Sequence, residues 1–205
     1  MIYQIYPDKP NENLLQECAD RLRKGDIAII PTDSVYAVAG DFQAPGALEK
    51  LAKIKGEAVK QSEFSFIFTD LSQLSDFTLP LSGPSFKTVK KLLPGPYTIV
   101  LEANNNLGKT LGQKRKTIGV RIPNHPITLK LSELLGRPLA TTSLHHDDDL
   151  LQYPTDPEEI VAKYSHLADF TIDGGWGDNI PSTVVDLTSG APEVIREGKG
   201  DVSVI

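Results

Sequence analysis

Residues 26–34 read DIAIIPTDS, a run of four apolar residues that ends abruptly in proline and three small polar residues. An uninterrupted apolar run of this length, closed by Pro31, is typical of a strand buried on both faces of a sheet. In open α/β sheets, ligands bind where such strands end. The sequence therefore predicts a ligand site in the polar segment 31–34.

Helical and extended patterns alternate around this strand, with short connections and a strand-rich final third. Helices are predicted at residues 12–24, 45–54, 84–93, 126–136 and 157–164. Strands are predicted at residues 2–6, 26–30, 64–68, 97–101, 117–122, 139–142, 170–172, 183–187 and 193–196. The alternation predicts an α/β protein with a single twisted mixed sheet, helices on its faces and one domain over residues 1–205.

Four single residues within this pattern give expectations that a structure can check. Asn11 is expected to cap the first helix, and Pro45 to lie in the first turn of the second. Phe86 is expected to face inward from the helix at 84–93. Cys18 falls on the apolar face of the first helix, which predicts a buried structural thiol.

The composition is that of a globular protein outside the membrane. The chain has 205 residues, of which 40% are hydrophobic and 23% charged. No apolar run approaches the ~20 residues needed to cross a bilayer, and the N-terminus does not resemble a secretory signal. Its single cysteine excludes an internal disulfide. These features predict a cytoplasmic protein with no membrane contact.

Positive charge is concentrated in one part of this acidic chain. The net charge is −6, yet residues 87–121 hold eight basic side chains and a single acidic one, Glu102. Such a band suggests a bound anion. A polyphosphate, an RNA backbone and a merely solvated basic face all remain possible on charge alone.

Three familiar-looking patterns carry little weight. Residues 107–110, LGKT, resemble the end of a P-loop, but position 103 is alanine where that motif needs glycine. The glycine cluster 174–177 is typical of a turn. Residues 145–149, HHDDD, could hold a cation, although a solvated loop is the simpler interpretation.

Small hydroxyl and basic residues gather at four predicted strand ends, at 31–34, 114–117, 141–143 and 181–183. Taken singly, each is typical of a turn or a helix cap. Hydroxyls and backbone amides also bind phosphate oxygens, and lysine or arginine neutralises their charge. Together the four segments therefore favour a phosphate-binding site.

Seven short stretches of the chain occur in the order found in the YrdC/YciO family, and they span nearly its whole length. They are residues 31–36 (PTDSVY), 54–56 (IKG), 94–98 (PGPYT), 119–123 (GVRIP), 142–143 (TS), 181–186 (PSTVVD) and 196–198 (REG). Residues 114–119 (KRKTIG) and 196–202 (REGKGDV) most resemble the YciO branch. The resemblance implies a twisted open α/β fold with a basic concave cavity.

The resemblance also implies an activity, the synthesis of L-threonylcarbamoyl-AMP and pyrophosphate from ATP, L-threonine and bicarbonate, for threonylcarbamoyladenosine in tRNA. ATP would be a substrate, with Mg²⁺, and double-stranded RNA or tRNA a further partner. Matched by motif, the threonine-binding residues are Ser34, Arg121, Thr141 and Ser182. The ATP-binding residues are Lys55, Thr117, Ser143 and Arg196, of which Lys55 also faces the bicarbonate or carbamate. No resident metal ligand is implied.

Three positions depart from the pattern of the active enzymes. Their Lys-x-Arg becomes Lys55-Gly56-Glu57, their Ser-x-Asn becomes Ser143-Leu144-His145, and a threonine-facing histidine becomes Phe66. Glu57 reverses a charge beside the expected triphosphate. Two alternatives therefore stay open, a non-catalytic double-stranded RNA-binding or ribosome-associated module and an ATP-binding regulator.

Overall fold

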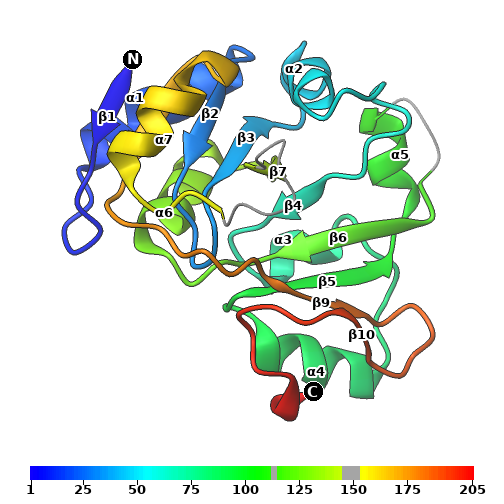
Figure 1. Cartoon of the computed structure of the whole chain (residues 1–205). Coiled ribbons are helices and arrows are strands. Elements are labelled where there is room, and N and C mark those ends of the chain that lie inside the picture. Colours follow the sequence, from blue (N-terminus) through cyan, green and yellow to red (C-terminus); the bar gives the residue numbers. More distant parts are fainter. Residues whose placement is uncertain (112–114, 145–152) are drawn as a thin grey trace.

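One mixed sheet of ten strands forms the centre of the molecule (Figure 1). The computed structural model describes residues 1–111, 115–144 and 153–205. The strands are β1 (Ile2–Gln4), β2 (Ile27–Ile30), β3 (Ala37–Asp41), β4 (Ser65–Ile67), β5 (Tyr97–Glu102), β6 (Thr117–Arg121), β7 (Leu139–Ser143), β8 (Phe170–Asp173), β9 (Thr183–Asp186) and β10 (Glu193–Arg196). Their order in the sheet is β1-β8-β2-β3-β7-β4-β6-β5-β9-β10. The predicted single mixed sheet is confirmed.

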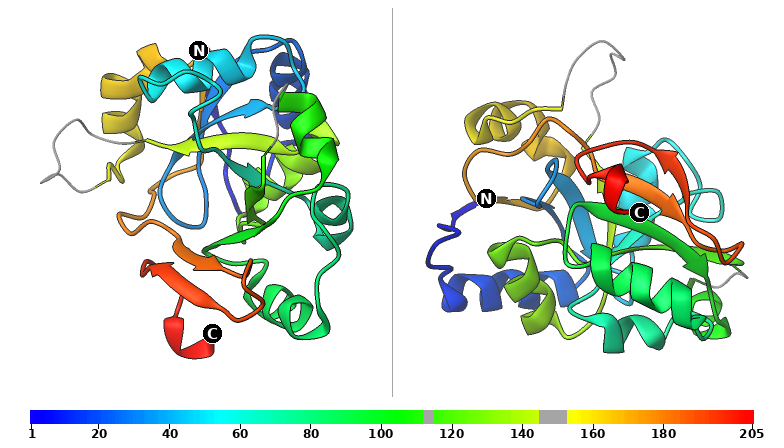
Figure 2. Two further views of the ribbon diagram at one scale, coloured as in Figure 1. Left: turned by 90° about the vertical axis from the view of Figure 1, so that its right-hand side faces the viewer. Right: turned by 90° about the horizontal axis from the view of Figure 1, so that it is seen from below.

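The helices lie on both faces of this sheet. They are α1 (Glu12–Arg23), α2 (Ala47–Ile54), α3 (Leu71–Ser75), α4 (Gly83–Leu92), α5 (Asn105–Leu111), α6 (Pro126–Leu135) and α7 (Pro157–Tyr164), with 3-10 turns η1 (Ser165–Leu167) and η2 (Val202–Val204). Seen from below, α4 covers β5, and the C-terminus lies beside α4 (Figure 2). Among the described helices, none combines the length and apolarity needed to cross a bilayer.

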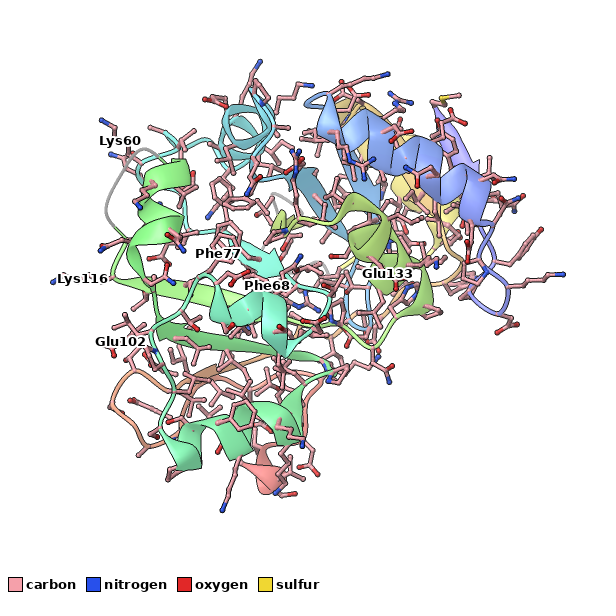
Figure 3. All side chains as sticks on the ribbon, turned by 180° about the vertical axis from the view of Figure 1, so that it is seen from behind. Lys60, Phe68, Phe77, Glu102, Lys116 and Glu133 are labelled. Atoms are coloured by element: carbon pink, nitrogen blue, oxygen red, sulfur yellow. The ribbon has the colours of Figure 1, made fainter. Side chains whose placement is uncertain are left out.

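Two hydrophobic cores hold these layers together. The smaller core joins α1 and α6 to β1, β8 and β2. The larger core receives side chains from α2, α3, α4, α5 and α7. Its aromatic part includes Phe68 and Phe77, whose ring centroids are 5.8 Å apart and which lie next to α3 (Figure 3). Some residues of this larger core, among them Phe66, Leu107 and Tyr164, also line the cavity described below.

The path between β8 and β9 is long in space although short in sequence. β8 pairs with β2 near one edge, whereas β9 pairs with β5 near the other. Residues 174–182 must therefore cross the front of the sheet, as the orange segment in Figure 1 does. This crossing brings late residues of the chain next to the loop that follows β2.

Two of the four single-residue expectations are confirmed. Asn11 caps α1 through its side chain, which accepts from the amides of Asn13 and Leu14. Cys18 is fully buried, and burial raises the pKa of its thiol to about 12. Two expectations are wrong. Pro45 precedes α2, whose N-cap is Gly46 with φ of 78°, and Phe86 is 46% exposed, because Val89 and Leu92 occupy the inner face of α4.

The sequence pattern missed β3, α3 and α5. In β3, small residues replace the β-branched ones that mark a strand. A side chain at Gly40 would be crowded, because a Cβ atom there would lie 3.0 Å from Ile27 Cγ2 and 3.2 Å from Ala47 Cβ. The helix α2 thus packs directly on β3. The helices α3 and α5 are too short for their apolar period to be visible.

Candidate functional site

A cavity of about 980 Å³ lies against β7, β4, β6, β5 and β9, and residues of α2, α5 and α7 complete its lining. Strand pairing places Thr141, Ser65 and Gly119 side by side across β7, β4 and β6, and all three line the cavity. The volume lies at the upper end of the ~300–1,000 Å³ typical of small-molecule sites. It is large enough for a nucleotide together with a second small substrate.

The fold brings the expected site residues to this one cavity. Seven of the eight residues that the resemblance assigns line it: Lys55, Thr117, Arg121, Thr141, Ser143, Ser182 and Arg196. The eighth, Ser34, is buried just behind the lining, and its Oγ accepts a hydrogen bond from Arg121 Nη2 at 3.0 Å. Residues in or directly next to five elements (α2, β6, β7, β9 and β10) and the loop after β2 therefore meet at one place.

The described lining is strongly cationic. Its lysines and arginines are Lys55, Arg115, Arg121, Lys163 and Arg196. Glu63 is the single carboxylate among the described lining residues. The cavity thus concentrates positive charge in a protein whose net charge is −6, and low-dielectric walls strengthen the field that such charges produce.

Arg121, at the end of β6, is the most buried of these cations, with 6% of its surface exposed. Its Nη2 donates to Asp33 Oδ1 at 3.0 Å, whereas its Nε is buried without a partner in the described part of the chain. Burial lowers the pKa of Arg121, the pairing with Asp33 opposes that shift, and nearby Arg196 adds to it. An anion beside Arg121 would satisfy the free Nε and reduce the repulsion between the two arginines.

The loop after β2 is held in one conformation by short polar contacts. Thr32 Oγ1 donates to Val35 O at 2.7 Å and accepts from the amide of Ser34 at 3.1 Å. Asp33 Oδ2 accepts from the amide of Asn124 at 2.8 Å. These bonds fix the side chains of Asp33 and Ser34 against Arg121, so the predicted ligand segment 31–34 reaches the cavity through Arg121.

Hydroxyl groups line the cavity between its cations. Thr141 Oγ1 donates to Ser65 O at 3.0 Å, and the hydroxyls of Thr98 and Ser182 are 2.8 Å apart. Each of these buried hydroxyls keeps acceptor capacity after these contacts. They are suited to receive hydrogen bonds from a substrate amine or hydroxyl.

A second polar group surrounds Arg196, at the end of β10. Arg196 Nη2 donates to Ser182 O at 2.7 Å. Tyr153 interacts with both Arg196 and Ser143. Burial raises the pKa of Tyr153, whereas the charge of Arg196 and a hydrogen bond with Ser143 lower it. Thr117, at the exposed start of β6, lines the same cavity. A phosphate chain or a ribose would meet both cation and hydroxyl here.

Lys55, at the C-terminal end of α2, is engaged by its neighbours. Its Nζ donates to Glu63 O at 2.9 Å and lies 3.4 Å from Glu57 Oε2. Glu57, whose negative charge would repel a phosphate, therefore forms an ion pair with the lysine that the resemblance assigns to the reaction. A phosphate would have to compete with this carboxylate for Lys55.

The other two departures differ in what the structure says of them. Phe66 is buried, lines the cavity and packs edge-on against Phe42, with ring centroids 5.8 Å apart. It therefore makes that part of the lining apolar. His145, like the possible cation ligands at 145–149, lies outside the described residues.

The basic band at 87–121 does not form one surface. Lys87, Lys90 and Lys91 are exposed on α4, which packs with Ile99 and Val185 in the larger core. Thr98, Val100 and Val184 line the cavity instead. Because side chains alternate along a strand, α4 and the cavity lie on opposite faces of β5 and β9. Arg115 and Arg121 serve the cavity, and the three lysines of α4 do not.

Sequence reasoning did not single out Arg115 and Lys163 as site residues. Arg115 Nη2 donates to Ser62 O at 2.5 Å, which ties the segment before β4 to the start of β6. Lys163 reaches the lining from α7 and pairs with Glu159 at 2.6 Å. Arg115 lay in the basic band and in the segment 114–117 that was expected to bind phosphate, but it received no role of its own. Lys163 follows an acidic helical turn and gave no signal.

Comparison with known proteins supports the family assignment. The Sua5/YciO/YrdC family model, described as "Telomere recombination", matches residues 20–198. The chain belongs to the Sua5/YciO/YrdC family. Within this family it is 36% identical to the uncharacterized protein YciO of Escherichia coli (strain K12), over 98% of this chain and 96% of that one.

The comparisons also include a threonylcarbamoyl-AMP synthase and two solved structures. The chain is 31% identical to the threonylcarbamoyl-AMP synthase of Mus musculus, over 90% of this chain and 66% of that protein. The crystal structure of E. coli YciO superposes with a TM-score of 0.89 and covers 100% of this chain and 98% of its own. P. abyssi Sua5 complexed with L-threonine is 26% identical, with a TM-score of 0.85 over 97% of this chain and 57% of that one.

Proposed function

We propose that this chain is an ATP-dependent nucleotidyltransferase of the threonylcarbamoyl-AMP synthase type. Its substrates would be ATP, L-threonine and bicarbonate, and its products L-threonylcarbamoyl-AMP and pyrophosphate, for the modification of tRNA. The observation that carries the proposal is Arg121, a buried arginine with a free Nε in a cavity that holds four further basic side chains. The reaction would proceed in the cytoplasm, where ATP is available.

The amino acid would bind at the Arg121 end of the cavity. A guanidinium binds a carboxylate through two parallel hydrogen bonds, and Ser34, Thr141 and Ser182 supply hydroxyl groups around it. Arg121 Nη2 already donates to Asp33 Oδ1 and Ser34 Oγ, so the substrate carboxylate would accept from Nε or Nη1, and it would bind through two parallel hydrogen bonds only by displacing one of these two acceptors.

The nucleotide would bind with Lys55, Thr117, Ser143 and Arg196 around its phosphates and ribose. Threonine and bicarbonate would first give a carbamate with loss of water. A carbamate oxygen would then attack the α-phosphorus of ATP, and pyrophosphate would leave with Mg²⁺, which enters as the ATP complex. Both reacting groups are anionic, so fixed cations and positioning supply the main catalytic effect, without a covalent nucleophile.

The comparisons support this proposal in two ways. A threonylcarbamoyl-AMP synthase is 31% identical to the chain over most of its length. A structure of Sua5 with L-threonine shares the fold, and Arg121, Thr141 and Ser182 of this chain gather in one cavity.

Pyrophosphate release tests the proposal. Purified protein is incubated with MgATP, L-threonine and bicarbonate, and pyrophosphate is measured with each substrate omitted in turn. The expected result is release that requires all three. Release absent from folded protein, or independent of threonine, would contradict the proposal. Arg121→Met serves as the inactive control, and Lys130→Met, which alters a surface ion pair on α6, serves as the active one.

A second candidate is an RNA-binding module, favoured by the three exposed lysines on α4. Lys87, Lys90 and Lys91 lie on the face opposite to the cavity, so RNA could bind there without entering the cavity. Affinity for double-stranded RNA should then fall steeply with salt. Replacement of these three lysines by glutamine should abolish it, and Arg121→Met should leave it unchanged. The reverse pattern would exclude α4 as the RNA surface.

A third candidate is a regulator that binds ATP without turning it over, favoured by the ion pair between Glu57 and Lys55. Calorimetry with ATP, with and without threonine, separates this candidate from the enzyme. Binding of ATP with no pyrophosphate formed would favour the regulator. Turnover with threonine would exclude it.

A further inference from the structure

The end of β10 and the segment that follows it contact two parts of the candidate site. Arg196, the last residue of β10 and one of the expected ATP-binding residues, donates to Ser182 O, and three residues later Lys199 reaches the loop after β2. Lys199 Nζ donates to the backbone carbonyl of Asp33 at 2.6 Å and lies 2.8 Å from Asp178 Oδ2. Lys199 thus joins the C-terminal segment to the loop that positions Arg121.

The loop after β2 is hydrogen-bonded on two sides, at the consecutive residues Asp33 and Ser34. On the cavity side, Asp33 holds Arg121 and Asn124 through its two carboxylate oxygens. On the outer side, Lys199 holds the carbonyl of Asp33, and the amide of Asp178 donates to the carbonyl of Ser34 at 3.2 Å. Because Lys199 also pairs with Asp178, one lysine connects both outer contacts.

The backbone around Lys199 is itself held in place by hydrogen bonds. Its amide donates to Pro181 O at 2.8 Å, and Thr183 Oγ1 accepts from the amide of Gly198 at 3.0 Å while it donates to Gly200 O at 2.7 Å. A Cβ atom on Gly198 would lie 2.3 Å from Pro181 O. The segment is therefore pressed against the backbone before β9 and cannot shift freely.

A purely structural role is a weak explanation for this arrangement. The side chains of Lys199 and Asp178 are 39% and 28% exposed, and ion pairs in such positions add little to stability. What distinguishes this pair from an ordinary surface pair is its second contact, with the backbone beside Ser34. Its effect is therefore expected on geometry rather than on folding.

We propose that Lys199 is a positioning residue of the amino-acid subsite, which clamps the loop 31–34 so that Asp33 and Ser34 hold Arg121 in the orientation that receives a substrate carboxylate. This inference rests on the proposed function for its kinetic consequence, but the clamp itself is a property of the folded chain. A smaller hollow of about 440 Å³, lined by Lys199, Asp178 and residues 31–34, lies on the outer side of the clamp. Loss of Lys199 would let the loop relax into that space.

The first experiment needs no substrate. Amide hydrogen exchange is compared in wild type, Lys199→Met, Lys199→Arg and Lys130→Met, with attention to the amides of Ser34 and Asp178. We expect faster exchange at both amides in Lys199→Met, restored protection in Lys199→Arg, and no change in Lys130→Met. Unchanged exchange at Ser34 and Asp178 in Lys199→Met would overturn the clamp, whether or not the protein turns over threonine.

The second experiment measures the kinetic consequence. Misplacing a substrate-binding group by about 1 Å can cost on the order of 100-fold in rate. We therefore expect kcat/KM for threonine to fall by about 10- to 100-fold in Lys199→Met, through KM, while KM for ATP changes less than about twofold. Equal increases in both KM values would reject a subsite-specific role. If wild type shows no threonine-dependent turnover, the proposed function fails, while the exchange experiment still decides the clamp.

Discussion

Replacing Arg121 by methionine tests the centre of the candidate site through folding alone. The Arg121 and Asp33 side chains are 7% and 8% exposed, and their closest atoms are 3.0 Å apart. Methionine fills a similar volume without charge, so the substitution removes one partner of a buried ion pair and leaves Asp33 as an uncompensated buried carboxylate.

The expected magnitude follows from what Asp33 keeps. Removing one partner of a buried pair costs about 3–5 kcal/mol. Asp33 retains the hydrogen bond from the amide of Asn124 at 2.8 Å, which places the loss near the lower limit. A loss of about 3 kcal/mol lowers the melting temperature of a protein of this size by about 6–12 °C.

The assay is thermal unfolding followed by circular dichroism, completed as a double-mutant cycle with Asp33→Asn. Because the double variant no longer buries a lone charge, it should recover part of the loss, a coupling of about 1–3 kcal/mol. Lys163→Met is the matched control, since its pair with Glu159 is 51% and 42% exposed and adds little to stability. A shift for Arg121→Met no larger than that of Lys163→Met would refute the reasoning.

Four further predictions concern other parts of the molecule. Lys55→Ala should abolish ATP binding or turnover. It should cost less than about 1.5 kcal/mol of stability, because it removes one partly exposed hydrogen bond. A lower melting temperature with intact ATP affinity would show that the role of Lys55 is structural. Glu57→Arg should tighten ATP binding measured by calorimetry, since it releases Lys55 and adds a cation, and an unchanged Kd would place Glu57 away from the phosphates. Burial lowers the pKa of His125 in the folded protein, so on acidification the unfolded chain binds a proton on this histidine at a higher pH than the folded chain does. The free energy of unfolding should therefore decline as the pH falls below about 6.5. His125→Asn should reduce that decline in unfolding curves recorded from pH 7.5 to 5, and an identical pH profile would contradict the assignment. Cys18, whose pKa is raised to about 12, should resist alkylation in the native protein and react on unfolding; rapid labelling of the folded chain would show that it is not buried.

The fold was largely predictable because its local signals are strong. The capped helix at α1, the buried strand β2 and the proline-initiated helices α6 and α7 carry patterns that tertiary contacts do not override. β3 was missed because a helix packs so closely on it that only small residues fit, and those residues have no strand preference of their own. The helical period placed Val89 correctly on the inner face of α4, but it does not show how far that buried face extends, and Phe86 lies outside it.

The candidate site was predictable in its membership but not in its connections. Ser34 and Arg121 are 87 positions apart, and their contact exists because β6 pairs in parallel with β4 and ends near the loop after β2. The order of motifs indicated that both residues matter, without showing that they contact each other or that Asp33 also binds Arg121. Lys199 lay in the stretch 196–202 that resembles the YciO branch but received no role of its own, since neither of its two acceptors is near it in sequence. The basic band is divided by the sheet, because Lys87, Lys90 and Lys91 lie on α4, on the face opposite to the cavity that Arg115 and Arg121 line.

The crossing of residues 174–182 has a consequence for how the protein is made. A chain emerging from the ribosome can pack α1, α2, β2, β3 and β7 long before Arg196 and Lys199 have been synthesised. The cavity gains the cation Arg196, and the loop after β2 its outer clamp, only once residues 196–199 have been made. A nascent chain that stops before them would thus hold most of its hydrophobic interior while its binding surface is still incomplete.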